Sequence, residues 1–243
     1  MNLTSVLRST VVILLLGALA VATPARGEII AAWDFEGMGP GTNEPPLYPW
    51  ATTNGTVGGY NDSNLDTVVL TAHNLTPGDQ PSDFYRFSGW GNMNTAPADI
   101  PSSHPNYIEF TLAAHPTYQF SLNASTSIHG SVRDYQNGPN ILVLRSSLDG
   151  FTATLDSRAG SWQSGTWILD VGSGFNYLTG VTFRLYVCNT NDISNSSVAL
   201  RPDESVATGA LANVDLVING SVVPEPATAL VAVLALLALV RRK

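Results

Sequence analysis

The sequence predicts an all-β fold, an antiparallel β-sandwich, on three observations. Between residues 28 and 220, no stretch longer than about eight residues repeats its apolar positions with helical period. Strand-like runs instead recur between clusters of Gly, Asn, Asp and Pro. Some runs, such as Val181 to Cys188, alternate along the chain in the way of a strand with one buried face. Many short strands joined by turns are typical of antiparallel sandwiches.

Ten strands are expected in this region. They cover Ile29 to Phe35, Thr67 to Ala72, Phe84 to Phe87, Tyr107 to Leu112, Tyr118 to Ser127, Ile141 to Ser147, Phe151 to Leu155, Trp167 to Val171, Val181 to Cys188 and Leu211 to Asn219. The sixth and seventh should form a tight hairpin, because Asp149-Gly150 supplies the positive φ angles of such a turn. Residues 37–66 and 89–105 are rich in Gly, Pro, Asn and Thr and are predicted to be loops.

Residues 1–27 have the pattern of a secretory signal peptide. Arg8 precedes an apolar run from Val11 to Val21, and the small residues Ala22, Thr23, Ala25 and Gly27 follow it. A run this short, flanked by small residues, favours a cleaved signal helix over a permanent anchor. The mature chain should then begin near Glu28.

The C-terminal segment, residues 221–243, combines three features. Pro224-Glu225-Pro226 is an extended polar motif, because proline breaks helices and restricts the residue before it. An uncharged run from Ala227 to Val240 follows it, and at about 1.5 Å per helical residue this run reaches only about 21 Å of a hydrocarbon core about 30 Å thick. The basic stop Arg241, Arg242 and Lys243 places the C-terminus in the cytoplasm and the rest outside. We expect a short transmembrane helix that holds the chain for a limited time.

Composition limits the functions of the exported part. Residues 28–220 contain six arginines, no lysine and eighteen carboxylates, a formal charge of −12. Nucleic acid is therefore excluded as a partner, because its phosphates would be repelled. Cys188 is the only cysteine, so no disulfide can form within the chain, and its position in an alternating strand predicts a buried, unreactive thiol.

The tail resembles the PEP-CTERM sorting signal of exported bacterial proteins. The resemblance covers Val223 to Lys243 and depends on the order of the Pro-Glu-Pro motif, the apolar run and the basic stop. It implies an exosortase-like membrane protease and the secretion machinery as partners. The strings at residues 144–151, 183–186 and 214–220 are also similar to those of exported jelly-roll domains that carry such tails. This second resemblance implies a jelly-roll-like sandwich of unassigned biochemical role.

A structural calcium ion is one possible cofactor, and no other is predicted. Asp34, Glu36 and Asp215 stand near the ends of the first and last expected strands, and carboxylates are calcium ligands. They could meet if these two strands pair; otherwise they are surface acids. A chelator should then lower the melting temperature of the protein, and an unchanged melting curve would refute the site.

No catalytic residue is predicted. Glu109 is on the polar face of its expected strand, but no second acid stands two or four residues away, whereas glycoside hydrolysis needs two carboxylates about 5 to 10 Å apart. The four histidines are scattered, and no GxSxG motif marks a nucleophile. Arg145 and Arg184 should face solvent as ion-pair partners.

Sugar binding is the more specific hypothesis. Sugar sites use an exposed aromatic ring as an apolar platform beside hydrogen-bonding side chains. Trp50, Tyr60, Trp90 and Trp162 lie in polar, loop-like surroundings, although aromatic residues in loops also plug the ends of sandwiches. The sequence thus predicts a non-enzymatic exported surface or matrix protein, with polysaccharide as a candidate ligand. A secreted carbohydrate-active hydrolase on a sandwich scaffold is the alternative.

Overall fold

The computed structural model describes residues 28–33, 50–51, 59–77, 85–90, 96–122, 128–134, 141–159, 165–188, 197–201 and 216–225. They form β1 (Glu28–Trp33), β2 (Trp50–Ala51), β3 (Gly59–Asn61), β4 (Val69–His73), β5 (Thr76–Pro77), β6 (Tyr85–Ser88), η1 (Pro97–Asp99), β7 (Tyr107–Ala113), β8 (Tyr118–Leu122), β9 (Ile128–Asp134), β10 (Ile141–Ser146), η2 (Ser147–Asp149), β11 (Asp156–Ala159), β12 (Gly165–Leu169), β13 (Gly180–Cys188), β14 (Ser197–Arg201) and β15 (Leu216–Pro224).

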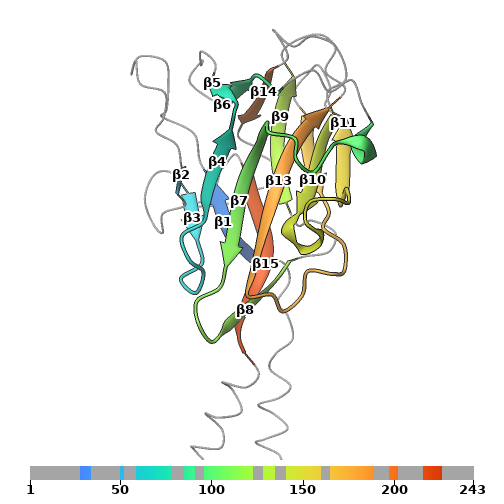
Figure 1. Cartoon of the computed structure of the whole chain (residues 1–243). Helices are drawn as coiled ribbons and strands as arrows, with labels where there is room; N and C mark the ends of the chain where they lie inside the picture. Colours follow the sequence, from blue (N-terminus) through green and yellow to red (C-terminus); the bar gives the residue numbers. More distant parts are fainter. Residues whose placement is uncertain are drawn as a thin grey trace, which may run out of the picture.

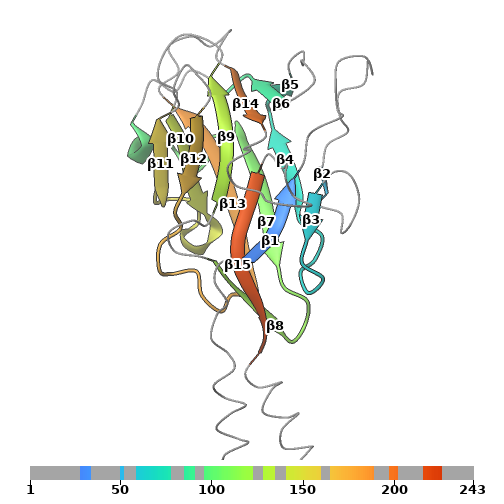
Figure 2. The same ribbon diagram turned by 180° about the vertical axis from the view of Figure 1, so that it is seen from behind.

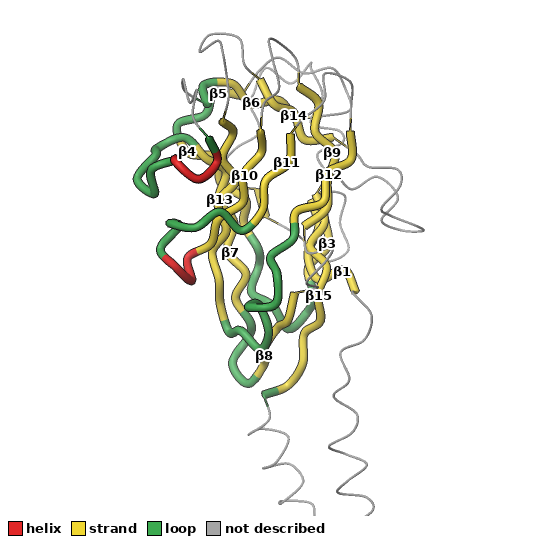
Figure 3. Tube along the Cα trace, turned by 90° about the vertical axis from the view of Figure 1, so that its right-hand side faces the viewer, coloured by secondary structure: helices red, strands yellow, loops and turns green. Residues whose placement is uncertain are grey.

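These strands build two antiparallel sheets that pack face to face (Figure 3). The six-stranded sheet has the order β11-β10-β13-β7-β4-β2 and faces the viewer in Figure 1. The nine-stranded sheet has the order β3-β1-β15-β9-β14-β6-β5, with β12 paired to β9 and β8 paired to β15, and is seen from outside in Figure 2. The predicted antiparallel β-sandwich is confirmed.

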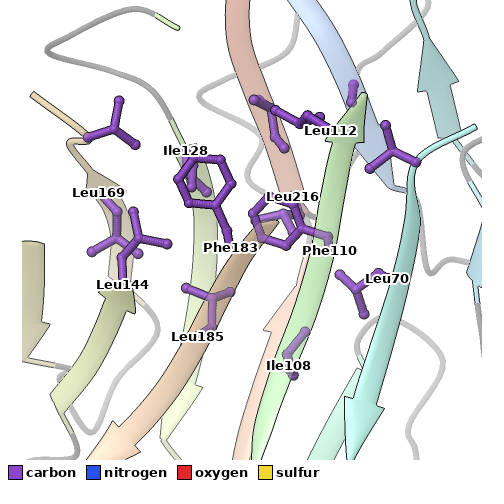
Figure 4. Packing of buried hydrophobic residues seen from close by; sticks show 14 of the residues in the cluster. Leu70, Ile108, Phe110, Leu112, Ile128, Leu144, Leu169, Phe183, Leu185 and Leu216 are labelled. Atoms are coloured by element: carbon purple, nitrogen blue, oxygen red, sulfur yellow. The ribbon is translucent and has the colours of Figure 1, made fainter. Parts of the chain in front are cut away.

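The core lies between the sheets because alternate residues of each strand point inward. In β7 the inward residues are Ile108, Phe110 and Leu112, and in β13 they include Phe183 and Leu185, all at most 2% exposed. Figure 4 shows these side chains meeting Leu216 and Ile128 from the opposite sheet. Each such side chain contributes roughly 1.5 to 3 kcal/mol when it leaves water, so in the absence of a disulfide this core holds the sandwich together.

A smaller second core lies on the outer face of the six-stranded sheet. Ile100, from the segment after η1, covers Val143, Tyr186 and Cys188, which point away from the main core. Figure 3 shows the two short helices η1 and η2, in red, on the outside of this sheet. One end of the outer face is therefore closed to solvent.

Cys188 belongs to this second core, and burial raises the pKa of its thiol from 9 to about 11. Thiol reagents should thus leave the native protein unlabelled at pH 8 and label it in urea, which mass spectrometry can count. The unfolded thiol loses its proton near pH 9 and the folded one near pH 11, so the folded state holds more protons between these values. Stability should fall as pH rises through this window, and less so in Cys188→Ser. Rapid native labelling would contradict the assignment.

Several predicted elements differ from the structure. The segment 37–66, predicted to be a loop, contains β2 and β3, and β5, β9 and β14 lie where no strand is predicted. The predicted strand Phe151 to Leu155 is not a strand, and Asp149-Gly150 ends η2 instead of forming a tight turn. β10 pairs instead with β11, which begins at Asp156. Gly150 does have the expected positive φ, 70°, and Phe151 shares it at 62°. The connection is longer than predicted because residues 147–155 fold over the outer face of the sheet, where Phe151 contacts Arg184.

The last strand also extends further than predicted. β15 ends at Pro224 and not at Asn219, so the expected domain boundary at residue 220 falls inside a strand. Gly220 pairs with Glu28 of β1 on one side and Leu122 of β8 on the other. A Cβ at this position would lie 2.5 Å from the carbonyl oxygen of Ser121, so a residue without a side chain lets β8 approach.

The two predicted apolar helices, residues 11–21 and 227–240, lie outside the described residues. Among the residues that are described, no helix is long and apolar enough to cross a membrane.

Candidate functional site

The candidate site is on the outer face of the six-stranded sheet, where the outward residues of β4, β7 and β13 lie side by side. The register places Thr71 beside Glu109 and Glu109 beside Arg184, and the next row joins Thr111 to Thr182. These residues are outward because their neighbours in sequence fill the core. The face thus presents a row of charged groups next to a row of hydroxyls.

An ion pair lies at the centre of this face. Arg184 Nε donates to Glu109 Oε2 at 2.8 Å, and His73 Nε2 is 3.7 Å from Glu109 Oε1. The guanidinium carbon of Arg184 lies 4.2 Å from the ring centre of Tyr107 and 3.8 Å from that of Phe151. Both partners are about one-quarter exposed or less, so the surrounding rings and strands fix their positions. The prediction that Arg184 is an ion-pair partner is confirmed.

A groove of about 360 Å³ runs beside this ion pair. Its lining residues come from β4, β7 and the segment before β4: Asp66, Thr67, Val69, Thr71, Glu109, Phe110, Thr111 and Ala113. Asp66 is anchored by His115, whose Nε2 lies 3.2 Å from Asp66 Oδ1, and the hydroxyls of Thr111 and Thr182 are 2.8 Å apart. The groove therefore holds threonine hydroxyls and two carboxylates, of which Glu109 is held by Arg184 and Asp66 is largely exposed.

The sequence could not show that a second acid joins Glu109. Asp66 precedes β4, more than forty residues before Glu109, and both line the groove because β4 pairs with β7. The backbone N–H of Asp66 donates to the carbonyl oxygen of Ala113, four residues along β7 from Glu109. Glu109 nevertheless accepts a hydrogen bond from Arg184, whereas the acid of a glycoside hydrolase must donate a proton. The pair gives the hydrolase alternative its one structural observation.

Arg145 corrects a prediction, because its side chain is fully buried rather than solvent-facing. Its Nη1 donates to the carbonyl oxygens of Ile100 at 2.6 Å and Phe151 at 3.0 Å, and its Nη2 donates to that of Pro97 at 2.9 Å. No ion pair of Arg145 occurs among the described residues. The arginine thus fastens the η1 and η2 segments over the sheet and shapes one end of the candidate site.

Of the four aromatic residues predicted to bind sugar, Trp90 lies where a sugar cannot reach it. It is 0% exposed and belongs to the main core, so it plugs the sandwich instead of offering a ring to solvent. Tyr60 is half-buried and packs beside Ala32 and Val217. The side chains of Trp50 and Trp162 lie outside the described residues, and their assignment stays a prediction.

Among the residues that the structure describes, Tyr177 is an exposed aromatic that sequence reasoning missed. It is 59% exposed, its φ is 57°, and its backbone N–H donates to Ser121 Oγ at 3.0 Å. A bulky residue with positive φ is uncommon, and such strain persists only where neighbouring structure enforces it. No signal in the sequence marks Tyr177, because Phe175 is buried and Tyr177 exposed within a stretch that forms no regular strand.

The calcium candidates fall just beyond the described strand ends. β1 and β15 pair, with Trp33 opposite Leu216, so the condition set for a shared site is met. Asp34, Glu36 and Asp215 themselves lie outside the described residues, and the calcium site stays a prediction. Within the described ranges, no group of three or more potential metal ligands occurs.

The comparisons with known proteins give a distant likeness. No protein-family model and no curated protein matches the sequence. A family 29 carbohydrate-binding module mutant in complex with mannohexaose is similar in structure, with a TM-score of 0.37, 9% identity, and coverage of 80% of this chain and 93% of that one. A second family 29 module gives a TM-score of 0.32 and 9% identity over 70% and 86% of the two chains. Values this low transfer no ligand to this chain.

Proposed function

We propose that this chain is a non-enzymatic exported protein of the cell surface or matrix, whose jelly-roll-like sandwich binds polysaccharide in the groove beside Glu109. The observation that carries this proposal is the groove itself. The Glu109 carboxylate and the Thr111 hydroxyl are held by Arg184 and Thr182, Asp66 lies 3.2 Å from His115, and polar groups set in a groove beside apolar atoms are what a sugar site requires. The proposed export and sorting rest on the C-terminal segment, residues 221–243.

The binding test uses the full-length protein in detergent and affinity electrophoresis against a panel of soluble polysaccharides. One or more should retard the protein, and Asp66→Ala should weaken that binding about tenfold, because a hydrogen bond to a charged group contributes about 1.5 to 3 kcal/mol. Asp66 is 64% exposed, so its removal should leave the fold intact.

Asp99→Ala provides the matched control, since Asp99 is an exposed acid of η1 that does not line the groove. It should bind like the unaltered protein. If Asp66→Ala and Asp99→Ala weaken the binding equally, or if neither weakens it, the groove is not the binding site.

The hydrolase alternative is tested in the same samples. Incubation with any polysaccharide that binds should release no new reducing ends if the protein only binds. Release that disappears in both Asp66→Asn and Glu109→Gln would instead assign the two groove carboxylates to catalysis.

The proposed route begins at the signal peptide and ends with a membrane protease of the exosortase type acting on the tail. Its support is the order of Pro224-Glu225-Pro226, the apolar run and the basic stop. Mass spectrometry of the C-terminus of protein isolated from its native host tests this route. A mature chain that retains Arg241 to Lys243 would replace sorting with a permanent anchor.

A further inference from the structure

The first part of the sorting motif belongs to the folded sandwich. Val222, Val223 and Pro224 of β15 pair with Phe120, Gln119 and Tyr118 of β8. The ladder continues one residue further, because the N–H of Glu225 donates to the carbonyl oxygen of Thr117 at 2.8 Å. Two residues of Pro-Glu-Pro are therefore held by the sheet.

Upstream of this point, every residue of β15 is paired with at least one neighbouring strand. Residues Leu216 to Ile218 lie between β1 and β9, and from Gly220 onward β8 takes over as a partner. Leu216, Ile218 and Gly220 are buried, and Ile30 and Leu122 close around the position of the missing Gly220 side chain. This strand is thus part of the main core and of the backbone ladder at once.

A protease needs a substrate segment whose backbone groups are not already paired. Many enzymes and receptors bind a peptide as an added strand, through backbone N–H and C=O groups that are free to pair. Groups already paired within a sheet become available only when the sheet opens, which costs free energy. A cut before Glu225 would also detach part of β15 from the core.

We propose that the β8–β15 ladder sets the upstream limit of tail processing, so that the cut falls on the C-terminal side of Glu225 and the mature sandwich keeps all of β15. This inference rests on the proposed sorting of the chain by its tail. The cut breaks one peptide C–N bond and adds water across it: the carbonyl carbon gains the hydroxyl and the leaving nitrogen gains the proton. No oxidant or reductant is needed.

The limit can be measured without the natural protease. Full-length protein in detergent is treated with proteinase K, and intact masses are recorded over time. The longest-lived fragment should end at Glu225 or beyond it. A long-lived fragment that ends between Leu216 and Pro224 would overturn the proposal. The C-terminus of protein from the native host should obey the same limit, and a mature end before Glu225 would also overturn it.

Gln119 provides a matched pair of variants. Gln119→Ala keeps the backbone N–H of β8 and should preserve the limit, whereas Gln119→Pro removes it from the middle of the ladder and should raise the rate of cutting within residues 221–225 about tenfold. If Gln119→Pro fails to fold, hydrogen exchange of the Glu225 amide in the unaltered protein decides instead. Slow exchange supports the ladder, and exchange at the free-peptide rate overturns it.

The result separates this inference from the proposed function. A native chain that retains Arg241 to Lys243 defeats the sorting proposal, while the proteinase K map still confirms or refutes the limit set by β8. A processed native chain that ends upstream of Glu225 keeps the sorting proposal and refutes the limit.

Discussion

Arg145→Met should lower the free energy of unfolding by about 3 kcal/mol or more. Methionine fills much of the volume of the arginine side chain but removes the donors to the carbonyl oxygens of Ile100 and Phe151. The carbonyl oxygen of Pro97 also loses Arg145 but keeps the hydroxyl of Thr154 as a donor at 3.0 Å. Each buried acceptor that loses its partner costs about 1 to 3 kcal/mol, and partial entry of water recovers some of that cost. The loss should also loosen the η1 and η2 segments over the second core, where Cys188 would become accessible to thiol reagents.

Urea unfolding followed by tryptophan fluorescence measures this change. Arg158→Met is the control, because Arg158 is 48% exposed and its ion pairs with Asp156 and Asp170, at 3.2 and 3.8 Å, are on the surface. Its effect should stay within about 0.5 kcal/mol. Equal effects of the two variants would show that the hydrogen bonds of Arg145 do not stabilise the packing of the η1 and η2 segments on the sheet.

Gly220→Ala should cost about 2 to 3 kcal/mol, a larger penalty than alanine usually brings to a strand. The added Cβ would meet the Ser121 carbonyl oxygen at 2.5 Å and the Ile30 side chain at 3.0 Å. The first of these atoms belongs to the backbone of β8, so relief requires that β8 move away from β15, and overpacking of this kind costs about 1 to 3 kcal/mol. Proteinase K should also cut this variant near residue 221 faster than it cuts the unaltered protein.

Gly174→Ala is the matched control, because nothing lies within 4 Å of a Cβ placed there. Thermal melting of both variants, with urea unfolding for the free energies, makes the comparison. A Gly220→Ala protein as stable as Gly174→Ala would mean that β8 does not approach β15 as closely as described.

The strands that alternate most clearly were the ones predictable from sequence. β7, β10 and β13 start and end within one residue of expectation, because inward residues such as Phe110 and Phe183 repeat every second position. β9 was missed: Ile128 opens it, but His129-Gly130-Ser131 gives no apolar alternation, and only pairing with β12, β14 and β15 makes it a strand. Tertiary pairing overrides weak local preference here.

The site was harder to predict than the fold. That Glu109 faces outward follows from alternation, and so does its pairing with a strand arginine, Arg184. That Arg145, two strands from Glu109 in the same row, is buried instead depends on loops whose path no local pattern reveals. Trp90 is a second example: its polar neighbours in the sequence predict an exposed loop residue, but its ring is buried in the core.

The pairing of β1 with β15 has a consequence for the order in which the molecule can fold. Glu28 opens the described chain and its partner Gly220 comes almost at the end, so the centre of the larger sheet cannot close until nearly the whole chain has emerged. Contacts so distant in sequence slow folding, because the entropy of closing the loop is lost before they form. The larger sheet would therefore be completed only when its last strand arrived. Pulse proteolysis of chains truncated before Leu216 would show whether they lack a protected sandwich, as this order requires.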